Sequence, residues 1–196
     1  QTCALPILFE SQLEACGVTY FDFYLMHAQS AKNYGHFKAC RAYETAFALK
    51  AEGRVRHVGL SFHDSAEVLE QILTEHPAIE AVQLQFNYAD YDDPKVQSRK
   101  CYEVCVKHGK PVIVMEPVKG GSLAALPEEV EAPFKEARPE ASTSSWAFRW
   151  VASHPDVHVV LSGMSTMEQV EDNIATMSPF QPLTEEDRDR KSTRLN

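Results

Sequence analysis

The stretch VRHVGLSFHDSAEVLEQILTEHPAIEAVQLQFN, residues 55–87, contains the pattern that decides the fold. It begins and ends with valine-rich apolar runs, residues 55–62 and 78–87, which are typical of buried strands. Between them, residues 65–76 have helical periodicity, with Asp64 or Ser65 as the cap and Pro77 as the stop. A strand, a helix and a strand in this order predict a βαβ unit with two parallel strands.

The same alternation continues on both sides of this unit. Further strands are predicted over residues 20–28, 111–118 and 157–165. Further helices are predicted over residues 34–53, 94–108, 142–154 and 167–177, and residues 11–16 are interpreted as the end of one more helix. The segment 119–141 interrupts the rhythm between a strand and its helix, in the type of loop where function concentrates. Five β/α units are therefore expected.

An open doubly wound sheet and a barrel both contain such units. An open sheet normally has a glycine-rich turn after its first strand. The turn predicted here, residues 28–34, contains no glycine. A (β/α)₈ barrel needs about 250 residues, and five units are three fewer than it has. We therefore predict an α/β fold, a partial (β/α)₈ TIM barrel of about five β/α units that correspond to strands 4 to 8.

Composition excludes several classes of function. The net charge of −9 makes a nucleic-acid partner unexpected. No apolar run approaches the length of a membrane span. Five cysteines, without the spacing of a disulfide framework, favour a reducing, cytoplasmic location. Cys101 and Cys105 are predicted to be half-buried helix thiols rather than a ligand pair.

Polar side chains collect where the predicted strands end. They are His27, then Ser61 and His63, then Gln83, Gln85 and Asn87, then Glu116, and finally Ser162. Strand ends meet loops, which explains any one of these residues. Because inward polar groups at the mouth of a barrel are costly unless water or a ligand satisfies them, five consecutive strand ends favour a site.

Five blocks in this order resemble the second half of the aldo-keto reductases. They are FDFYLMHA (21–28), RVRHVGLSF (54–62), VQLQFNY (82–88), VIVMEPVKGGSL (112–123) and VVLSGMSTMEQVEDN (159–173). The resemblance covers residues 9–180. Residues 1–8 (QTCALPIL) and 191–196 (KSTRLN) resemble translated sequencing-adapter sequence and are predicted to be non-native ends.

The wording SFHDSAEVL, QFNYADYDDP and QSRKCYEVC is similar to a microbial branch of the family. Members of this branch often continue into an iron–sulfur segment. The resemblance therefore implies that any 4Fe-4S cluster belongs to a segment beyond residue 196. A redox partner is compatible with that arrangement.

The resemblance implies a fragment of an NAD(P)H-dependent oxidoreductase, which reduces an aldehyde or ketone to an alcohol by hydride transfer. The family's tetrad is Asp, Tyr, Lys and His, in which Tyr donates the proton and His orients the small-molecule carbonyl substrate. Only the His has a match, His27, and we expect the chain alone to be inactive. A strand-end histidine bonded to a carbonyl is the simpler alternative for His27.

The resemblance also implies a cofactor site for NADP(H) or NAD(H). Ser61 and Gln83 match residues that bind the nicotinamide carboxamide, and Met115 falls where an aromatic residue often stacks on the ring. The loop residues Glu116, Pro117, Lys119, Gly120 and Gly121 match a segment near the pyrophosphate. The adenosine end matches Gly163, Ser165, Gln169 and Asn173.

Departures from the family pattern keep alternatives open. Residues 163–173 contain no Lys or Arg for the 2′-phosphate of NADP, and Lys119 is the other candidate cation. A metal-dependent barrel hydrolase would use His27, His63, Glu116 and Asp90 or Asp92 as ligands, although no metal site is expected. A non-catalytic nucleotide-sensing module is the third reading.

Overall fold

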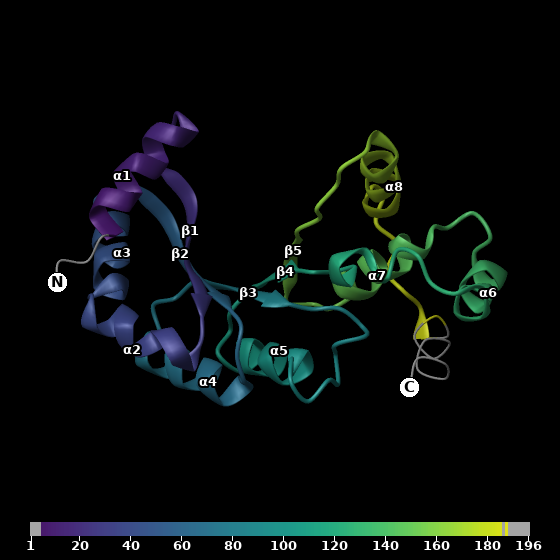
Figure 1. The fold of residues 1–196 in the computed structure, drawn as a ribbon, viewed down its shortest axis with the longest axis horizontal. Coiled ribbons are helices and arrows are strands. Elements are labelled where there is room, and N and C mark those ends of the chain that lie inside the picture. The colour runs from purple at the N-terminus through teal and green to yellow at the C-terminus, as the bar shows by residue number, and fades with distance from the viewer. Residues whose placement is uncertain (1–4, 186, 188–196) are drawn as a thin grey trace. The chain divides into compact units, whose positions relative to one another are not determined.

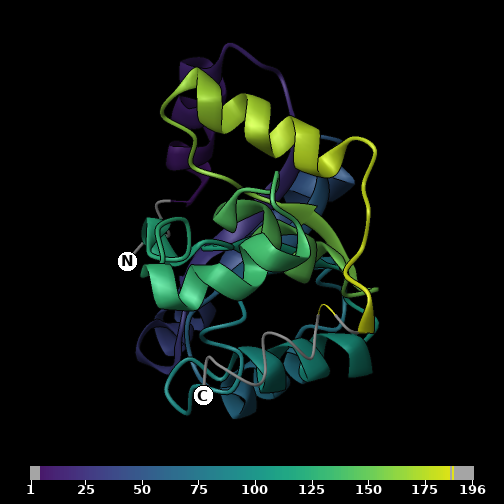
Figure 2. The same ribbon diagram turned by 90° about the vertical axis from the view of Figure 1, so that its right-hand side faces the viewer.

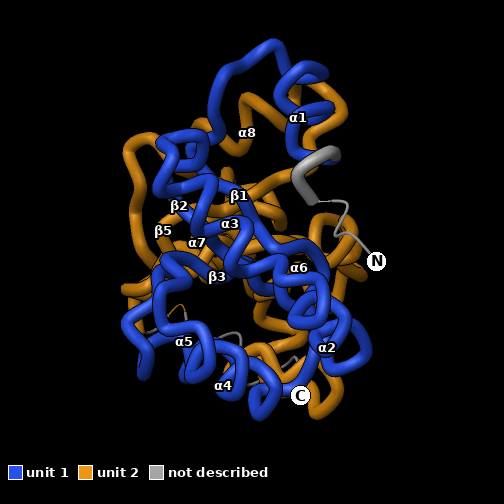
Figure 3. The backbone as a smooth tube through the Cα atoms, turned by 90° about the vertical axis from the view of Figure 1, so that its left-hand side faces the viewer, with its two compact units in different colours: residues 1–84, 100–111 blue, residues 85–99, 112–196 orange. Residues whose placement is uncertain are grey.

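The computed structural model describes residues 5–185 and 187. The chain divides into two compact units (Figure 3): unit 1 is formed by residues 1–84 and 100–111, and unit 2 by residues 85–99 and 112–196. The strand order β1-β2-β3-β4-β5 follows the chain (Figure 1), and the pairings within each unit are parallel. The predicted alternation of strands and helices around a parallel sheet is confirmed.

The elements are as follows. Unit 1 contains α1 (Leu5–Cys16), β1 (Phe21–Gln29), α2 (Ala31–Ala39), α3 (Ala42–Ala51), β2 (Val55–Phe62), α4 (Ala66–Glu75), β3 (Ala81–Gln85) and α5 (Ser98–Lys107), with the unit boundaries falling near the ends of β3 and α5. Unit 2 contains β4 (Val112–Met115), the 3-10 turn η1 (Lys119–Gly121), α6 (Glu128–Ala137), α7 (Thr143–Ala152), β5 (Val157–Val160) and α8 (Met167–Met177). No described helix is both long and apolar enough to cross a membrane.

In unit 1, helices α2, α3 and α4 lie along one side of β1 and β2 (Figure 1). Val58 and Leu60 of β2 and Leu69 and Ile72 of α4 are completely buried. Burying each such side chain stabilises the fold by about 1.5–3 kcal/mol. The helical spacing of the α4 residues and their burial show why this segment is a helix packed on the sheet.

The two cysteines of α5 belong to the interior of unit 1. Cys101 and Cys105 are both free thiols and both buried, more deeply than the predicted half-burial. Burial raises the pKa of the Cys101 thiol to about 12. A thiol so reluctant to ionise is a packing residue rather than a nucleophile or a metal ligand.

In unit 2, aromatic rings form the centre of the core. Trp150 of α7 stacks on Phe86 with ring centroids 5.2 Å apart, and the ring of Tyr91 meets it edge-on at 5.0 Å. Helix α8 packs against α7, and Figure 2 shows it from the side, after the loop that follows β5. The aromatic contacts hold residues 85–91 to α7, so the segment after β3 belongs to this unit.

One predicted helix, residues 34–53, is two helices. Arg41 adopts a left-handed backbone conformation with φ 55° and separates α2 from α3. The Cys40 amide bonds to the His36 carbonyl and closes α2, so the chain turns before α3 begins. Periodicity alone did not reveal the break, because Cys40 and Arg41 carry no turn signal. Gly53, with φ 75°, ends α3 as predicted.

Other boundaries also differ from the predictions. Helix α5 begins at Ser98 rather than Pro94, because Asp93 accepts hydrogen bonds from the Lys95 and Val96 amides and Gln97 is left-handed. The predicted strands 78–87, 111–118 and 157–165 are all shorter, as β3, β4 and β5. The insertion 119–141 contains η1 and α6 rather than loop alone. The predicted ends 191–196 and 1–4 lie outside the described residues, and residues 5–8 belong to α1.

Gly59 is a point of close contact between the strands of unit 1. It pairs with Leu25 on β1 and with Ala81 on β3. A Cβ atom at this position would lie 2.5 Å from Leu25 Cδ2 and 2.9 Å from the Ala81 carbonyl oxygen. Glycine is therefore required here by close packing rather than by its backbone angles.

We predict that Gly59→Ala lowers the free energy of unfolding by about 1–3 kcal/mol, because the backbone of β3 must move to admit a methyl group. Gly35→Ala is the matched control: nothing lies within 4 Å of its added Cβ on the exposed face of α2. This control should stabilise the protein by roughly 0.5–1 kcal/mol. Urea denaturation measures both changes, and equal effects would contradict the packing at Gly59.

Candidate functional site

Three residues predicted for the site form a row across the strands of unit 1. Ser61 of β2 is paired with Gln83 of β3. On β1, the register advances three residues from Met26 to Gln29 while β2 advances two, from Leu60 to Phe62. His27 and Ala28 therefore lie together opposite Ser61, in a β-bulge. The structure thus brings His27, Ser61 and Gln83 to one level of the sheet.

The three residues of this row differ in exposure to solvent. His27 is exposed, Gln83 is half-buried and Ser61 is buried. His63, at the end of β2, lies close enough to His27 for the charge of His27 to affect the pKa of His63. Desolvation, and to a smaller extent repulsion from His27, lowers the pKa of His63. A histidine kept neutral in this way can accept as well as donate a hydrogen bond near neutral pH.

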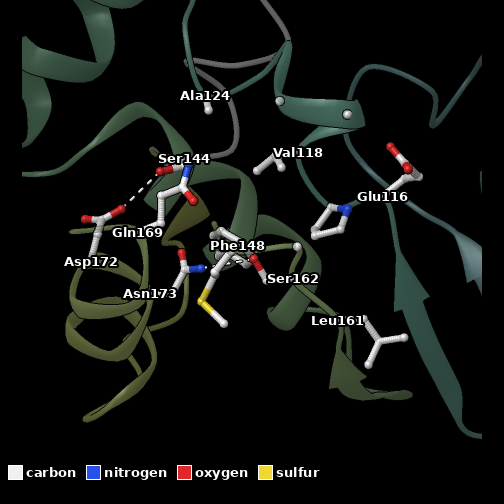
Figure 4. Close-up of a pocket in the computed structure, with 15 residues that line it drawn as sticks. Glu116, Val118, Ala124, Ser144, Phe148, Leu161, Ser162, Gln169, Asp172 and Asn173 are labelled. Atoms are coloured by element: carbon white, nitrogen blue, oxygen red, sulfur yellow. Dashed lines mark hydrogen bonds between the residues drawn. The ribbon is translucent and has the colours of Figure 1, made fainter. Parts of the chain in front are cut away.

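A pocket of about 330 Å³ lies within unit 2. Its walls come from the loop after β4, from α7, from the segment after β5 and from α8. Figure 4 shows Gln169, Asp172 and Asn173 on the α8 side, opposite Glu116 and Val118. Seven predicted cofactor residues line this pocket: Glu116, Pro117, Gly120, Gly121, Gly163, Gln169 and Asn173.

Hydrogen bonds hold the α8 wall of the pocket in place. The Gln169 side-chain oxygen accepts from the Ser165 amide at 2.6 Å and caps the start of α8 together with Thr166. Asn173 donates to the Ser162 hydroxyl at 3.0 Å (Figure 4). Of the predicted cofactor contacts, Gln169 thus also belongs to the helix cap and Ser165 is bonded to it through its amide, which orders the polar wall before any ligand binds.

The loop after β4 has an unusual backbone. Glu116, Lys119, Gly120 and Gly121 have φ values of 58°, 50°, 61° and 94°. The left-handed conformation costs a non-glycine residue roughly 1–2 kcal/mol, so surrounding contacts must hold Glu116 and Lys119. The amides of Lys119, Gly121 and Ser122 all bond to carbonyls within the loop. These amides shape the pocket wall and are already satisfied before a phosphate could approach.

A buried carboxylate fixes this loop. Asp90 is 2% exposed and accepts hydrogen bonds from Lys119 Nζ at 2.6 Å, Asn87 Nδ2 at 2.8 Å and Gln85 Nε2 at 2.8 Å. Asn87 also donates to the Glu116 carbonyl at 3.0 Å. Burial raises the pKa of Asp90, but the three donors outweigh it and hold this pKa below its ordinary value. The charged carboxylate therefore tethers the loop at both Glu116 and Lys119.

This network changes the interpretation of several predicted residues. Asp90 already accepts hydrogen bonds from three N–H donors, one of them a cation, which makes it a poor metal ligand. In the described part of the chain, no group of three or more His, Cys, Asp and Glu side chains is arranged to hold a metal ion. Lys119 is engaged by Asp90, so its charge is compensated before it meets a cofactor phosphate.

The pocket has an acidic lining. Glu116 and Asp172 contribute carboxylates, and none of its described lining residues is Lys or Arg. Asp172 accepts from the Ser142 hydroxyl at 2.6 Å and the Ser144 hydroxyl at 3.0 Å. Lys119, Ser165 and Met115 are not among the lining residues. Asp172 was not predicted for the site, although its place three residues after Gln169, on the same face of the helix, was the available signal.

Comparisons with known proteins point in one direction. The model of the aldo/keto reductase family matches residues 8–191. An uncharacterized oxidoreductase of Schizosaccharomyces pombe is 30% identical over 127 residues, which cover 65% of this chain and 39% of that protein. An NADH-specific methylglyoxal reductase of Escherichia coli is 21% identical over 194 residues, 86% of this chain and 57% of that protein. The chain thus spans less than two thirds of either relative.

Solved structures agree on the fold. An aldo/keto reductase from Brucella melitensis superposes with a TM-score of 0.75 at 21% identity, over 100% of this chain and 68% of that one. The expected partial (β/α)₈ barrel is thereby confirmed as a fold. At this level of identity, the likeness carries no residue roles.

We predict that Asp90→Ala lowers the free energy of unfolding by about 2–4 kcal/mol, because Lys119, Asn87 and Gln85 lose a buried acceptor. Since the pKa of Asp90 lies below its ordinary 3.8, this stabilisation is complete at neutral pH and disappears as the pH falls through the pKa of the folded state. The deficit of the variant should therefore shrink in acid.

Asp92→Ala is the control, because Asp92 pairs with Arg99 at the surface, where both side chains are largely exposed. Its loss should cost less than about 1 kcal/mol. Denaturation curves at neutral and acidic pH give both values. A cost for Asp90→Ala no larger than that of the control would show that the tether does not hold the loop.

Proposed function

The chain belongs to the aldo/keto reductase family, and from this premise we propose that it binds a nicotinamide dinucleotide and serves the reduction of a carbonyl to an alcohol. The substrate class is a small aldehyde or ketone. Unit 2 contains the pocket that we propose for the nucleotide. Unit 1, taken by itself, contains a row of polar groups whose chemistry suits an amide and a carbonyl.

One observation carries the proposal. Residues that the family resemblance assigns to the cofactor come from two segments more than 40 residues apart in the sequence, yet Glu116, Gly121, Gly163, Gln169 and Asn173 line a single pocket of unit 2. Its volume of about 330 Å³ is at the lower end of the range of roughly 300–1,000 Å³ for small-molecule sites. Nothing lies within 4 Å of a Cβ placed on Gly163, so this wall leaves room for a ligand.

The row in unit 1 has the chemistry to hold an amide and a carbonyl. When bound, a nicotinamide cofactor supplies a hydride to the carbonyl carbon. Ser61 and Gln83, adjacent on paired strands, offer a hydroxyl and an amide that can bond the carboxamide. His27, exposed beside them, can donate to the carbonyl oxygen.

The proton donor is not among these groups. In the family resemblance the Tyr, Lys and Asp of the tetrad have no counterpart in the 196 residues, and His27 is the one member matched. We therefore propose that this polypeptide by itself binds the dinucleotide without reducing a carbonyl. Binding rather than turnover is consequently the appropriate test.

The charge of the pocket favours NADH over NADPH. A 2′-phosphate placed near Asp172 or Glu116 would meet a carboxylate, and the pocket lining in the described chain offers it no Lys or Arg. A carboxylate is instead suited to accept hydrogen bonds from a ribose diol. One relative carries the name NADH-specific methylglyoxal reductase, which is consistent with this choice.

Binding of NADH tests the pocket itself. Titration of NADH into the purified chain, followed by the fluorescence of the cofactor, should give saturable binding. Gly163→Leu should weaken it about tenfold or more by filling the pocket. Gly35→Leu, the same substitution at an open position on α2, should leave binding unchanged. Equal binding by a folded Gly163→Leu variant would rule out this pocket.

The second prediction concerns cofactor choice. Asp172→Asn removes a carboxylate from the pocket and should tighten NADPH binding relative to NADH roughly fivefold, equivalent to about 1 kcal/mol. Glu171→Gln makes the same charge change at an exposed position beside it, outside the lining. The ratio of the two dissociation constants should not change in this control. If both variants shift the ratio equally, the effect is general electrostatics and Asp172 has no special role.

A further inference from the structure

The β-bulge that carries His27 is held from behind by a buried polar contact. Gln29, the last residue of β1, is completely buried, and its side-chain oxygen accepts a hydrogen bond of 2.6 Å from the Tyr43 hydroxyl of α3. Tyr43 is 1% exposed. A side-chain hydrogen bond between two interior residues thus connects the helix layer to the strand end that bears His27.

Backbone contacts fix the other residues of the bulge. Ala28 is left-handed with φ 51°, and its carbonyl accepts from Asn33 Nδ2 at 2.8 Å. The Gln29 carbonyl accepts from the His63 amide at 3.0 Å. Each residue that follows His27 is therefore held by a different element: Ala28 by α2, and Gln29 by α3 and by the residue after β2.

Tyr43 is itself held rigidly. Its ring stacks on His76 with centroids 3.8 Å apart and an interplanar angle of 9°. Burial raises the pKa of Tyr43 well above its ordinary value, so the hydroxyl keeps its proton and remains a donor. The direction of its hydrogen bond to Gln29 is thereby set.

This contact is more costly than packing alone requires. Gln29 Nε2 is buried and has no hydrogen-bond partner among the described residues. A buried amide with an unmet donor destabilises a fold, and apolar side chains of similar shape would fill the same space without that cost. The Tyr43–Gln29 pair is therefore suited to a role that depends on the direction of its hydrogen bond, which apolar packing would not set.

We propose that Gln29 and Tyr43 are positioning residues, which fix the β-bulge at Ala28 and thereby the direction in which β1 presents His27. A bulge opposes two residues to one, and an unpinned bulge can migrate or relax. A register change of one residue would turn the following side chains to the opposite face of the sheet. The consequence of this orientation for catalysis rests on the proposed function of His27, but the orientation itself can be tested without measuring turnover.

The experiment compares two tyrosine variants by NMR of the full 196-residue chain. Tyr43→Phe removes the hydroxyl that bonds Gln29. Tyr34→Phe removes the hydroxyl of a neighbouring buried tyrosine, whose ring also packs on Tyr43 but whose hydroxyl bonds Glu75, at 2.6 Å, rather than a residue of the bulge. The readout is the imidazole ring signals of His27, with those of His57, an exposed histidine of β2, as an internal reference.

We expect Tyr43→Phe to shift the His27 signals and to leave those of His57 in place, while Tyr34→Phe shifts neither. Gln29→Met, which keeps the side-chain length without the acceptor, should reproduce the His27 shift. The double variant should add little to either change, because both remove one contact. Unchanged His27 signals in a folded Tyr43→Phe or Gln29→Met variant would overturn the proposal.

A measurement on the unmodified chain covers the case in which these variants do not fold. The backbone order parameter of His27 and Ala28 should equal the value of about 0.85 of rigid backbone. Values below about 0.6 would mean that the bulge is mobile despite the contact, and would equally overturn the proposal. NADH binding by the pocket of unit 2 is scored separately, so failure of the proposed function and failure of this inference give different results.

Discussion

Parallel backbone pairing is the constraint on which the rest of this structure depends. In a parallel ladder the carboxyl ends of neighbouring strands lie at the same edge. In unit 1, pairing of β2 with β3 puts Ser61 beside Gln83. In unit 2, pairing of Val114 with Val160 brings the loop after β4 and the segment after β5 to neighbouring positions. Hydrogen bonds between main chains therefore assemble polar side chains from distant parts of the sequence.

Both units end a strand in the same way. Ala28 follows His27 on β1, Glu116 follows Met115 on β4, and both are left-handed. The carbonyl of each accepts a hydrogen bond from an asparagine amide, Asn33 in unit 1 and Asn87 in unit 2. The strain of such a residue persists only where neighbouring contacts over-determine it. In both units those contacts come from a different element, so the shape of the strand end depends on packing of the whole unit.

Charge compensation within unit 2 decides what its pocket can attract. The loop residue Lys119 forms an ion pair with the buried Asp90. The carboxylates of Glu116 and Asp172 remain in the pocket lining. Because Asp90 is buried, leaving its carboxylate without a partner would cost several kcal/mol, and this desolvation penalty keeps Lys119 paired with it. The cation therefore maintains the loop, and its charge is already paired with a carboxylate, while the described lining residues themselves carry only negative charge.

Much of the architecture could be predicted from local pattern. The limits of β2 and α8 coincide with the predicted ranges 55–62 and 167–177, because apolar periodicity marks both segments and Gly53 and Thr166 come just before them. The break at Arg41 and the late start of α5 were missed, since the left-handed residues Arg41 and Gln97 have no sequence signature of that conformation. A non-glycine residue adopts it only when contacts elsewhere compensate the strain.

The candidate site divides along the same line. The order of residue types along the chain determined which polar positions lie at the ends of strands, and the family resemblance assigned some of them to a dinucleotide. The tertiary structure alone decided that seven of those assigned residues share one pocket, that Lys119 is paired with the buried Asp90, and that Asp172 lies in the lining. The physical reason is that burial and ion pairing depend on residues far away in the sequence. The identity of a side chain does not specify which of those residues will pack against it.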